Sequence, residues 1–353
     1  MKANNVQTVL LGFIALVLLG TVLKLAGAIL IPLVLASILS VVLSPMINRL
    51  DKCHFPRPVA VLIVIIFLSG IVFLITMFVQ ASINSFITEY PKYAERFGIL
   101  NSKIIRLSES RLGVSLDYFK DFNWAERLIP HLVSISSSIM SFAGKVLLIM
   151  IFLIFMLLEN PFSKKKLALA FDSNTGLRLA RMLHKINRQI ARYLNLKFFI
   201  SAATGILVWI SLKVIGLDFA LMWGVFAFLL NFIPSIGSAI VLFVTILMSF
   251  IQFYPSPGKI ASVIISMSLI QLIIGNFIDP RMQGHRLNLS PLVILFSLIF
   301  WGWIWGVVGM FLAVPITVIV QIICENIPFL RSVSVIMSSG RDLNEAKGTG
   351  SVK

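Results

Sequence analysis

Residues 219–253 read FALMWGVFAFLLNFIPSIGSAIVLFVTILMSFIQF, an apolar stretch that proline and glycine interrupt near its middle. A membrane-spanning helix needs roughly 20 residues to cross about 30 Å of hydrocarbon, so the stretch is too long for one span and short for two. Residues 291–324, PLVILFSLIFWGWIWGVVGMFLAVPITVIVQIIC, have the same character. Each stretch is expected to form two half-length helices that fold back on each other. The alternative is that each stretch crosses the membrane twice, which gives four short complete spans.

The composition of the whole chain indicates a polytopic membrane protein. Of its 353 residues, 58% are hydrophobic and only 12% are charged, and the mean hydropathy is +0.98. These values lie far from those of soluble domains. The net charge of +16 does not indicate nucleic-acid binding, because the basic residues cluster between the apolar runs. Two cysteines are too few for a disulfide framework.

Six further apolar runs predict continuous spans, so we expect an all-α membrane fold of six spans and two broken helical hairpins. With the N-terminus placed inside, most of the 30 Lys and Arg fall on the cytoplasmic side, in accord with the positive-inside rule. Both termini are then cytoplasmic. The six runs cover residues 6–23, 26–47, 58–83, 132–158, 198–215 and 260–278.

The same pattern predicts six segments along the chain. A helical extracytoplasmic segment is expected to break at Pro91, Gly98 and Gly113. The segments are N-terminal spans (1–83), the extracytoplasmic segment (84–131), a fourth span (132–158), a basic cytoplasmic segment (159–197), a transport domain (198–327) and a cytoplasmic tail (328–353).

The basic segment carries an amphipathic helical pattern. One face is basic and the other is apolar, which predicts a helix that lies on the anionic inner leaflet, with lipid as a partner. The basic face holds Arg178, Arg181, Lys185, Arg188 and Arg192, and the apolar face holds Leu183, Ile186, Ile190 and Leu194.

The two broken stretches are predicted to be inverted copies. The span at 198–215 runs outward, so the stretch after it enters from outside. The span at 260–278 runs inward, so the stretch after it enters from inside. Paired interrupted segments of opposite orientation are typical of carriers that work by alternating access, because their unwound backbone lines a polar cavity.

The tip of the first broken stretch is a candidate path for a polar solute or cation. Proline removes a backbone donor there and glycine permits a turn, so freed carbonyls, an amide and two hydroxyls become available. The alternative is a tight turn whose polar groups bond locally. The candidate residues are Asn231, Pro234, Ser235, Gly237 and Ser238.

A second candidate lies at the inner end of the span at 260–278. Asp279 and Arg281 flank Pro280 and follow Asn276, so the segment through Gly284 reads as a gate pair or an ion site. A helix-ending turn with an interfacial ion pair is the alternative. No carboxylate lies near a predicted span centre, which favours a neutral polar solute over proton exchange.

Three tryptophans, Trp301, Trp303 and Trp305, mark the second broken stretch. Their rings could stack on a sugar, but tryptophan also favours membrane interfaces, and we predict interface anchoring.

Three strings of the C-terminal half resemble the AI-2E family of transporters, in particular its autoinducer-2 exporter branch. They are residues 230–238 (LNFIPSIGS), 279–284 (DPRMQG) and 298–315 with their Trp-Gly-Trp and Ala-Val-Pro motifs. The resemblance implies a bacterial inner-membrane carrier, a homopentamer, that exports a small furanosyl quorum-sensing signal. The two inverted broken stretches predict that export proceeds by alternating access of an elevator-like kind. Some members are assigned sodium or lithium for proton exchange, so an antiporter stays open as an alternative, as does a non-transporting scaffold.

Enzymatic activity finds no support in the sequence. The four histidines are scattered, and neither a His-Glu-x-x-His, a Gly-x-Ser-x-Gly nor a P-loop pattern occurs. No cofactor or metal is expected, and transport is predicted to be secondary or passive.

Overall fold

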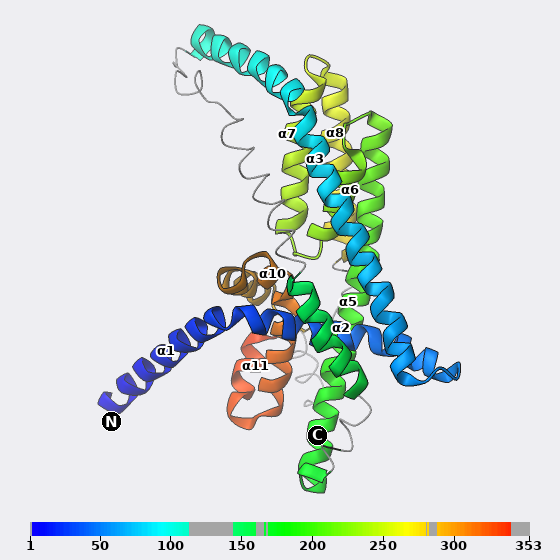
Figure 1. The fold of residues 1–353 in the computed structure, drawn as a ribbon. Coiled ribbons are helices and arrows are strands. Elements are labelled where there is room, and N and C mark those ends of the chain that lie inside the picture. Colours follow the sequence, from blue (N-terminus) through cyan, green and yellow to red (C-terminus); the bar gives the residue numbers. More distant parts are fainter. Residues whose placement is uncertain are drawn as a thin grey trace, which may run out of the picture. The chain divides into compact units, whose positions relative to one another are not determined.

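A computed structural model of the chain describes residues 2–112, 144–159, 166, 169–279, 281 and 288–339. The regular elements of this part of the chain are all helical (Figure 1). Six of these helices are long and apolar enough to cross a membrane, which confirms the all-α polytopic class. The elements are α1 (Lys2–Leu25), α2 (Gly27–Lys52), α3 (Arg57–Leu112), a helix at 144–159, α5 (Ser173–Ile215), α6 (Ala220–Leu230), α7 (Ile236–Phe253), α8 (Pro257–Ile270), the π-helix η2 (Gln271–Ile278), α10 (Pro291–Asn326), the short 3-10 helix η4 (Pro328–Leu330) and α11 (Arg331–Met337).

The chain divides into two compact units. The terminal unit comprises Met1–Ile66, Lys145–Asn195 and Gln283–Lys353, and the central unit comprises Phe67–Gly144 and Leu196–Met282. The first broken stretch belongs to the central unit and the second to the terminal unit. The predicted transport domain at 198–327 draws on both units and stays a prediction.

The first broken stretch forms a helical hairpin in the central unit. Helices α6 and α7 are separated by a turn at 231–235 and pack on each other, and α8 packs on α7 (Figure 1). The arms approach so closely that a Cβ added at Gly237 would lie 1.7 Å from the Leu230 carbonyl oxygen. Only glycine fits at this position, so the hairpin depends on it.

The second broken stretch also folds back on itself, within the terminal unit. Gly306 has φ 63° and ψ −144°, which divides α10 into two arms at the predicted position. A Cβ added at Gly309 would lie 1.9 Å from the carbonyl oxygen of Trp301. Further along the arms, the Ser297 hydroxyl donates to the Ala313 carbonyl at 3.1 Å. Pro315 lies inside the second arm and does not end it.

The lengths of the arms favour re-entrant hairpins over four complete spans. Helix α6 has 11 residues and is therefore about 16 Å long, and the arm of α10 before Gly306 is about 22 Å long. Neither reaches across about 30 Å of hydrocarbon. The second arms are longer, since α7 has 18 residues and extends about 27 Å. Each hairpin thus pairs a short arm with a longer one.

Helix α3 differs from expectation because it runs without interruption for 56 residues. The breaks predicted at Pro91 and Gly98 are wrong, and Gly113 lies outside the described residues. Proline removes only one backbone donor, and tertiary contacts can override such a local preference. Two contacts anchor this part of α3 in the central unit. The Tyr93 hydroxyl donates to Asp218 at 2.6 Å, and Arg96 donates to the Gln252 carbonyl at 2.7 Å.

The basic amphipathic pattern and the following span form one continuous helix, α5, of 43 residues. The apolar face of its first half is buried in the core of the terminal unit, where Ile186, Ile190 and Leu194 join Leu312 and Ile322 of α10. Protein rather than lipid therefore covers this face at Ile186, Ile190 and Leu194, whereas Leu183 is exposed. The continuous helix corrects the expectation of a separate helix lying on the leaflet. Contact between the basic face and lipid headgroups stays a prediction.

Candidate functional site

The tip of the first hairpin is bonded to two other elements of the central unit. The Asn231 side chain is buried, and its amide donates to the Ser201 hydroxyl of α5 at 3.1 Å. The Gln271 amide, at the start of η2, donates to the Ser238 hydroxyl at 2.8 Å. The polar groups predicted at this tip therefore cross-link helices rather than satisfying only their own turn.

The turn between the arms holds a strained residue. Ser235 has φ 61° and ψ −45°, and the Ile236 N–H donates to the Pro234 carbonyl at 2.6 Å around it. A side-chain-bearing residue in this region costs on the order of 1–3 kcal/mol. The sequence suggested that glycine permits the turn. Instead a serine takes the unusual conformation, and Gly237 serves the close approach of the arms.

A small cavity lies beside this tip, between α5, the first hairpin, α8 and η2. Its volume is about 20 Å³, which is room for about one water molecule. Three polar side chains line it, Thr204, Ser238 and Gln271, and apolar groups close the rest. The cavity is too small for a sugar-sized solute in this conformation.

The last span of the central unit ends as a π-helix rather than an α-helix. Residues Gln271–Ile278 form η2, which contains the candidate residue Asn276 on an exposed face. π-Helical turns are rare and frequently occur at functional sites. The sequence pattern gave no sign of this change, because Gly275 and its apolar neighbours are equally compatible with a regular helix.

The Asp279 carboxylate forms an ion pair with Lys197 of α5 across 2.9 Å. The Lys197 side chain is 1% exposed and that of Asp279 is 17% exposed. Sequence reasoning placed Lys197 in the basic cytoplasmic segment and missed this partner. A signal was present, because Lys197 continues the buried stripe of Ile190 and Leu194 at helical spacing and stands four residues before Ser201.

The other candidate residues that follow Asp279 are Pro280, Arg281 and Gly284, and the structure describes one of them. Arg281 is exposed, and its guanidinium lies 5.7 Å from the ring centroid of Phe277. Pro280 and Gly284 lie outside the described residues. The structure joins Asp279 to α5 through Lys197, and the gate pair of Asp279 and Arg281 stays a prediction. In the described part of the chain, no three His, Cys, Asp or Glu side chains are grouped as metal ligands.

The tryptophans of the second hairpin have separate surroundings. The Trp305 indole is buried and donates to the Leu23 carbonyl at 3.0 Å, and Trp301 packs against it with ring centroids 4.9 Å apart. Trp303 is exposed and lies under the Lys24 ammonium, 4.8 Å from the ring centroid. The rings therefore do not present one stacking surface, and the exposed Trp303 is compatible with a membrane interface.

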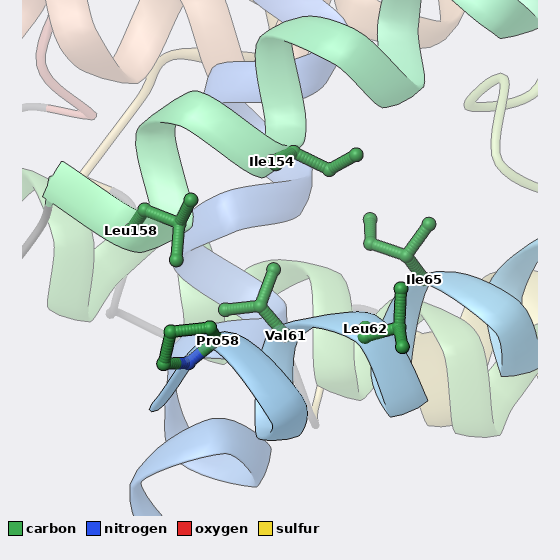
Figure 2. A pocket seen from close by; sticks show the side chains of 6 residues that line it. All are labelled: Pro58, Val61, Leu62, Ile65, Ile154 and Leu158. Atoms are coloured by element: carbon green, nitrogen blue, oxygen red, sulfur yellow. The ribbon is translucent and has the colours of Figure 1, made fainter. Parts of the chain in front are cut away.

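A larger cavity, of about 80 Å³, occurs in the terminal unit. Figure 2 shows that its side chains come from the start of α3 and from the helix at 144–159 and face one another. Because its lining is aliphatic, it offers nothing to orient a polar solute. The lining residues are Pro58, Val61, Leu62, Ile65, Ile154 and Leu158.

Comparisons with known proteins agree with this architecture. The chain matches the AI-2E family transporter description over residues 11–329. It is 33% identical over 331 residues to a putative transport protein of Borreliella burgdorferi, covering 94% of this chain and 90% of the relative. It is 32% identical over 345 residues to the AI-2 transport protein TqsA of Escherichia coli, covering 96% of each, and 30% identical over 346 residues to the putative transport protein YhhT of the same organism, covering 96% and 97%. This chain is a multi-pass membrane protein that belongs to the AI-2E family of transporters.

Proposed function

We propose that the chain is a secondary transporter that exports a small polar solute, with autoinducer-2 as the first solute to test. The proposal is supported by similarity to TqsA, which is described as an AI-2 transport protein. No P-loop occurs in the sequence, so nucleotide hydrolysis is not the expected energy source. Alternating access of an elevator-like kind suits the two broken hairpins, since such hairpins line transport paths in carriers.

One observation carries the proposal for the path. In the central unit, α5 holds both candidate segments through polar contacts, because Ser201 bonds Asn231 of the hairpin tip and Lys197 pairs with Asp279 after η2. Polar and charged groups are costly in a membrane interior and persist where they serve a site. The proposed path runs along this face of α5. Its residues are Asn231, Pro234, Ser235, Gly237, Ser238, Asn276, Asp279, Pro280, Arg281 and Gly284.

The proposed setting is the bacterial inner membrane, with both termini in the cytoplasm. The distribution of Lys and Arg along the sequence supports this orientation. A homopentamer is the proposed assembly, and the basic face of α5 is the proposed contact for anionic lipid headgroups. Cross-linking of the purified protein in native lipid would give the number of subunits.

An efflux assay with matched buried serines tests the path. Ser201→Ala removes the partner of Asn231, whereas Ser249→Ala removes an equally buried hydroxyl that bonds only to its own helix. In cells that produce autoinducer-2, Ser201→Ala and Asn231→Ala should reduce efflux at least tenfold at equal membrane abundance. Ser249→Ala should retain it. Equal efflux by all three variants would contradict the assigned path.

Cation exchange is the second candidate function, and one observation favours it. Asp279 is a mostly buried acid within the central unit, and antiporters use such acids to carry cations or protons. Purified protein in liposomes should then move protons when a sodium or lithium gradient is applied. If protein that exports autoinducer-2 moves no protons in this assay, cation exchange is excluded as its function.

A further inference from the structure

The short helices η4 and α11 cross the open end of the second hairpin. Both ends of α10 meet there, because the Gln321 amide donates to the Asn288 carbonyl at 2.7 Å. Helix η4 begins at Pro328, directly after the second arm. At the end of α11, the Met337 carbonyl accepts a hydrogen bond from the Ser290 N–H at 2.9 Å. The three residues of η4 and the seven of α11 therefore lead from the end of one arm to the start of the other.

A segment in this position runs along the membrane surface. Helix α10 is long and apolar enough to lie within a membrane, and a segment that links the two ends of its hairpin crosses the axes of both arms. Helix α11 is about 10 Å long, close to the distance of about 8–10 Å between the axes of packed helices. Its end is held in place, since the Asn288 side-chain oxygen accepts from the Ser339 N–H at 3.4 Å and from its hydroxyl at 3.1 Å.

Three large apolar side chains form an exposed strip along this segment. Phe329, Val333 and Ile336 follow one another at steps of four and three residues, so they share one face. They are 90%, 44% and 77% exposed, and Phe329 is the most exposed of the large apolar side chains in the described part of the chain. The polar Ser334, in contrast, is buried. A water-facing helix shows the opposite pattern, with its apolar side chains buried and its polar ones exposed.

A second strip on the other side of the segment has a different character. Arg331, Val335 and Ser338 follow one another at the same spacing, so they share a face as well. Between the two strips lies the face of Ser334 and Met337, which packs on the terminal unit. A helix that packs on protein along one face, with an apolar strip on one side and a charged and hydroxyl-bearing strip on the other, fits the boundary between lipid and water.

The apolar strip ends close to a surface of α10 that is suited to lipid. On the first arm, Leu292, Phe296 and Ile299 recur at steps of four and three residues and are exposed. Acyl chains are the surroundings that such a face of a membrane helix requires. Leu292 lies two residues after Ser290, which bonds the end of α11. The strip therefore extends the apolar surface of the hairpin at its open end.

We propose that η4 and α11 form an interfacial anchor, in which Phe329, Val333 and Ile336 insert into the boundary between headgroups and acyl chains. The partner is membrane lipid, and the strip of Arg331 and Val335 faces headgroups and water. The long Arg331 side chain can reach lipid phosphates from this position. Because the segment is bonded to both ends of α10, the anchor fixes the base of the second hairpin at the membrane surface, whichever solute is transported.

Spin labels test the depth of the two strips. The full-length protein, with Cys53 and Cys324 replaced by serine, receives one nitroxide label in the variants Val333→Cys, Ile336→Cys or Val335→Cys and is placed in vesicles of phosphatidylethanolamine and phosphatidylglycerol. Collision rates are measured with oxygen, which enters lipid, and with a water-soluble nickel chelate. The ratio of oxygen to nickel collisions should be at least about threefold higher at positions 333 and 336 than at position 335.

Two results of the labelling experiment would overturn the anchor. Equal ratios at positions 333 and 335, with frequent nickel collisions at both, would show that the apolar strip faces water. Rare collisions with both reagents at positions 333 and 336 would show that protein, such as a second copy of this chain, covers the strip instead of lipid.

A matched pair of valines gives a second test that needs no label. Val333 and Val335 are both 44% exposed but lie on different strips. In the same vesicles, Val333→Asp should accelerate amide hydrogen exchange in α11 at least tenfold, because a charge does not stay at the acyl boundary and the helix leaves the membrane. Val335→Asp should change it less than twofold. Equal acceleration by both variants, or by neither, contradicts the anchor.

Discussion

The substitution Gly237→Ala probes the closest approach within the first hairpin. The added Cβ would lie 1.7 Å from the Leu230 oxygen and 2.5 Å from its carbonyl carbon, whereas ordinary contacts begin at 3.4 Å. The clash is with backbone, so no side-chain rotation relieves it and the arms must separate by more than about 1.5 Å. Overpacking costs typically about 1–3 kcal/mol, and the upper end applies here.

The expected consequence is a loss of both stability and transport. A cost of about 3 kcal/mol lowers the unfolding temperature by about 6–12 °C in chains of 150–250 residues, and the decrease should be at or below the lower end of this range in a chain of 353 residues. Separation of the arms also displaces Asn231 and Ser238 from their partners Ser201 and Gln271. Autoinducer-2 efflux at equal membrane abundance should therefore decrease at least tenfold.

Gly258→Ala is the matched control in the same unit. A Cβ at Gly258 meets no atom within 4 Å, and alanine favours the helix over glycine by about 1 kcal/mol. Its unfolding temperature in detergent should equal or slightly exceed that of the wild type, with normal efflux. If Gly237→Ala matched Gly258→Ala in both measurements, the close packing of the two arms could not be correct.

Three other predictions follow from contacts described above. Lys197→Ala breaks a buried ion pair and should destabilise the protein by about 3–5 kcal/mol. Lys185→Ala breaks an exposed ion pair with Glu325 and should destabilise it by only about 0–1 kcal/mol. Thermal unfolding in detergent compares the two variants, and equal effects would contradict the burial of Lys197. Ser235→Gly should raise the unfolding temperature by about 2–4 °C if it releases about 1 kcal/mol of strain, whereas a decrease would mean that the turn is relaxed. Tyr93→Phe removes a hydrogen bond to the Asp218 carboxylate that contributes about 1.5–3 kcal/mol. Amide hydrogen exchange in the loop before α6 should therefore accelerate. Unchanged exchange would show that α3 does not stabilise this loop.

Much of the fold follows from hydropathy and from proline and glycine. The length of an apolar run and the position of its break are local properties, so the hairpins at Gly237 and Gly306 could be predicted to within a few residues. The class of the protein follows from the same pattern. The helix breaks predicted at Pro91 and Gly98 are wrong, because contacts made by Tyr93 and Arg96 keep α3 helical beyond these residues.

The candidate site was predictable only in part. Asn231 and Asp279 could be found because polar residues in apolar surroundings attract attention. Their partners, Ser201 and Lys197, come from a helix that is distant in sequence, and a lysine at the end of a basic segment looks like a solvated charge. A pairing across 82 residues depends on tertiary structure, so a single sequence does not reveal it.

The bond from Trp305 to Leu23 has a consequence for how the protein is made. The Leu23 carbonyl belongs to the last turn of α1, where helical carbonyls lack donors from their own helix, and its partner lies 282 residues further along the chain. At synthesis rates of about 5–20 residues per second, Trp305 is synthesised about 15–55 s after Leu23. During that interval the end of α1 depends on other donors, so nascent chains that stop before the second hairpin should be the species that membrane quality control removes.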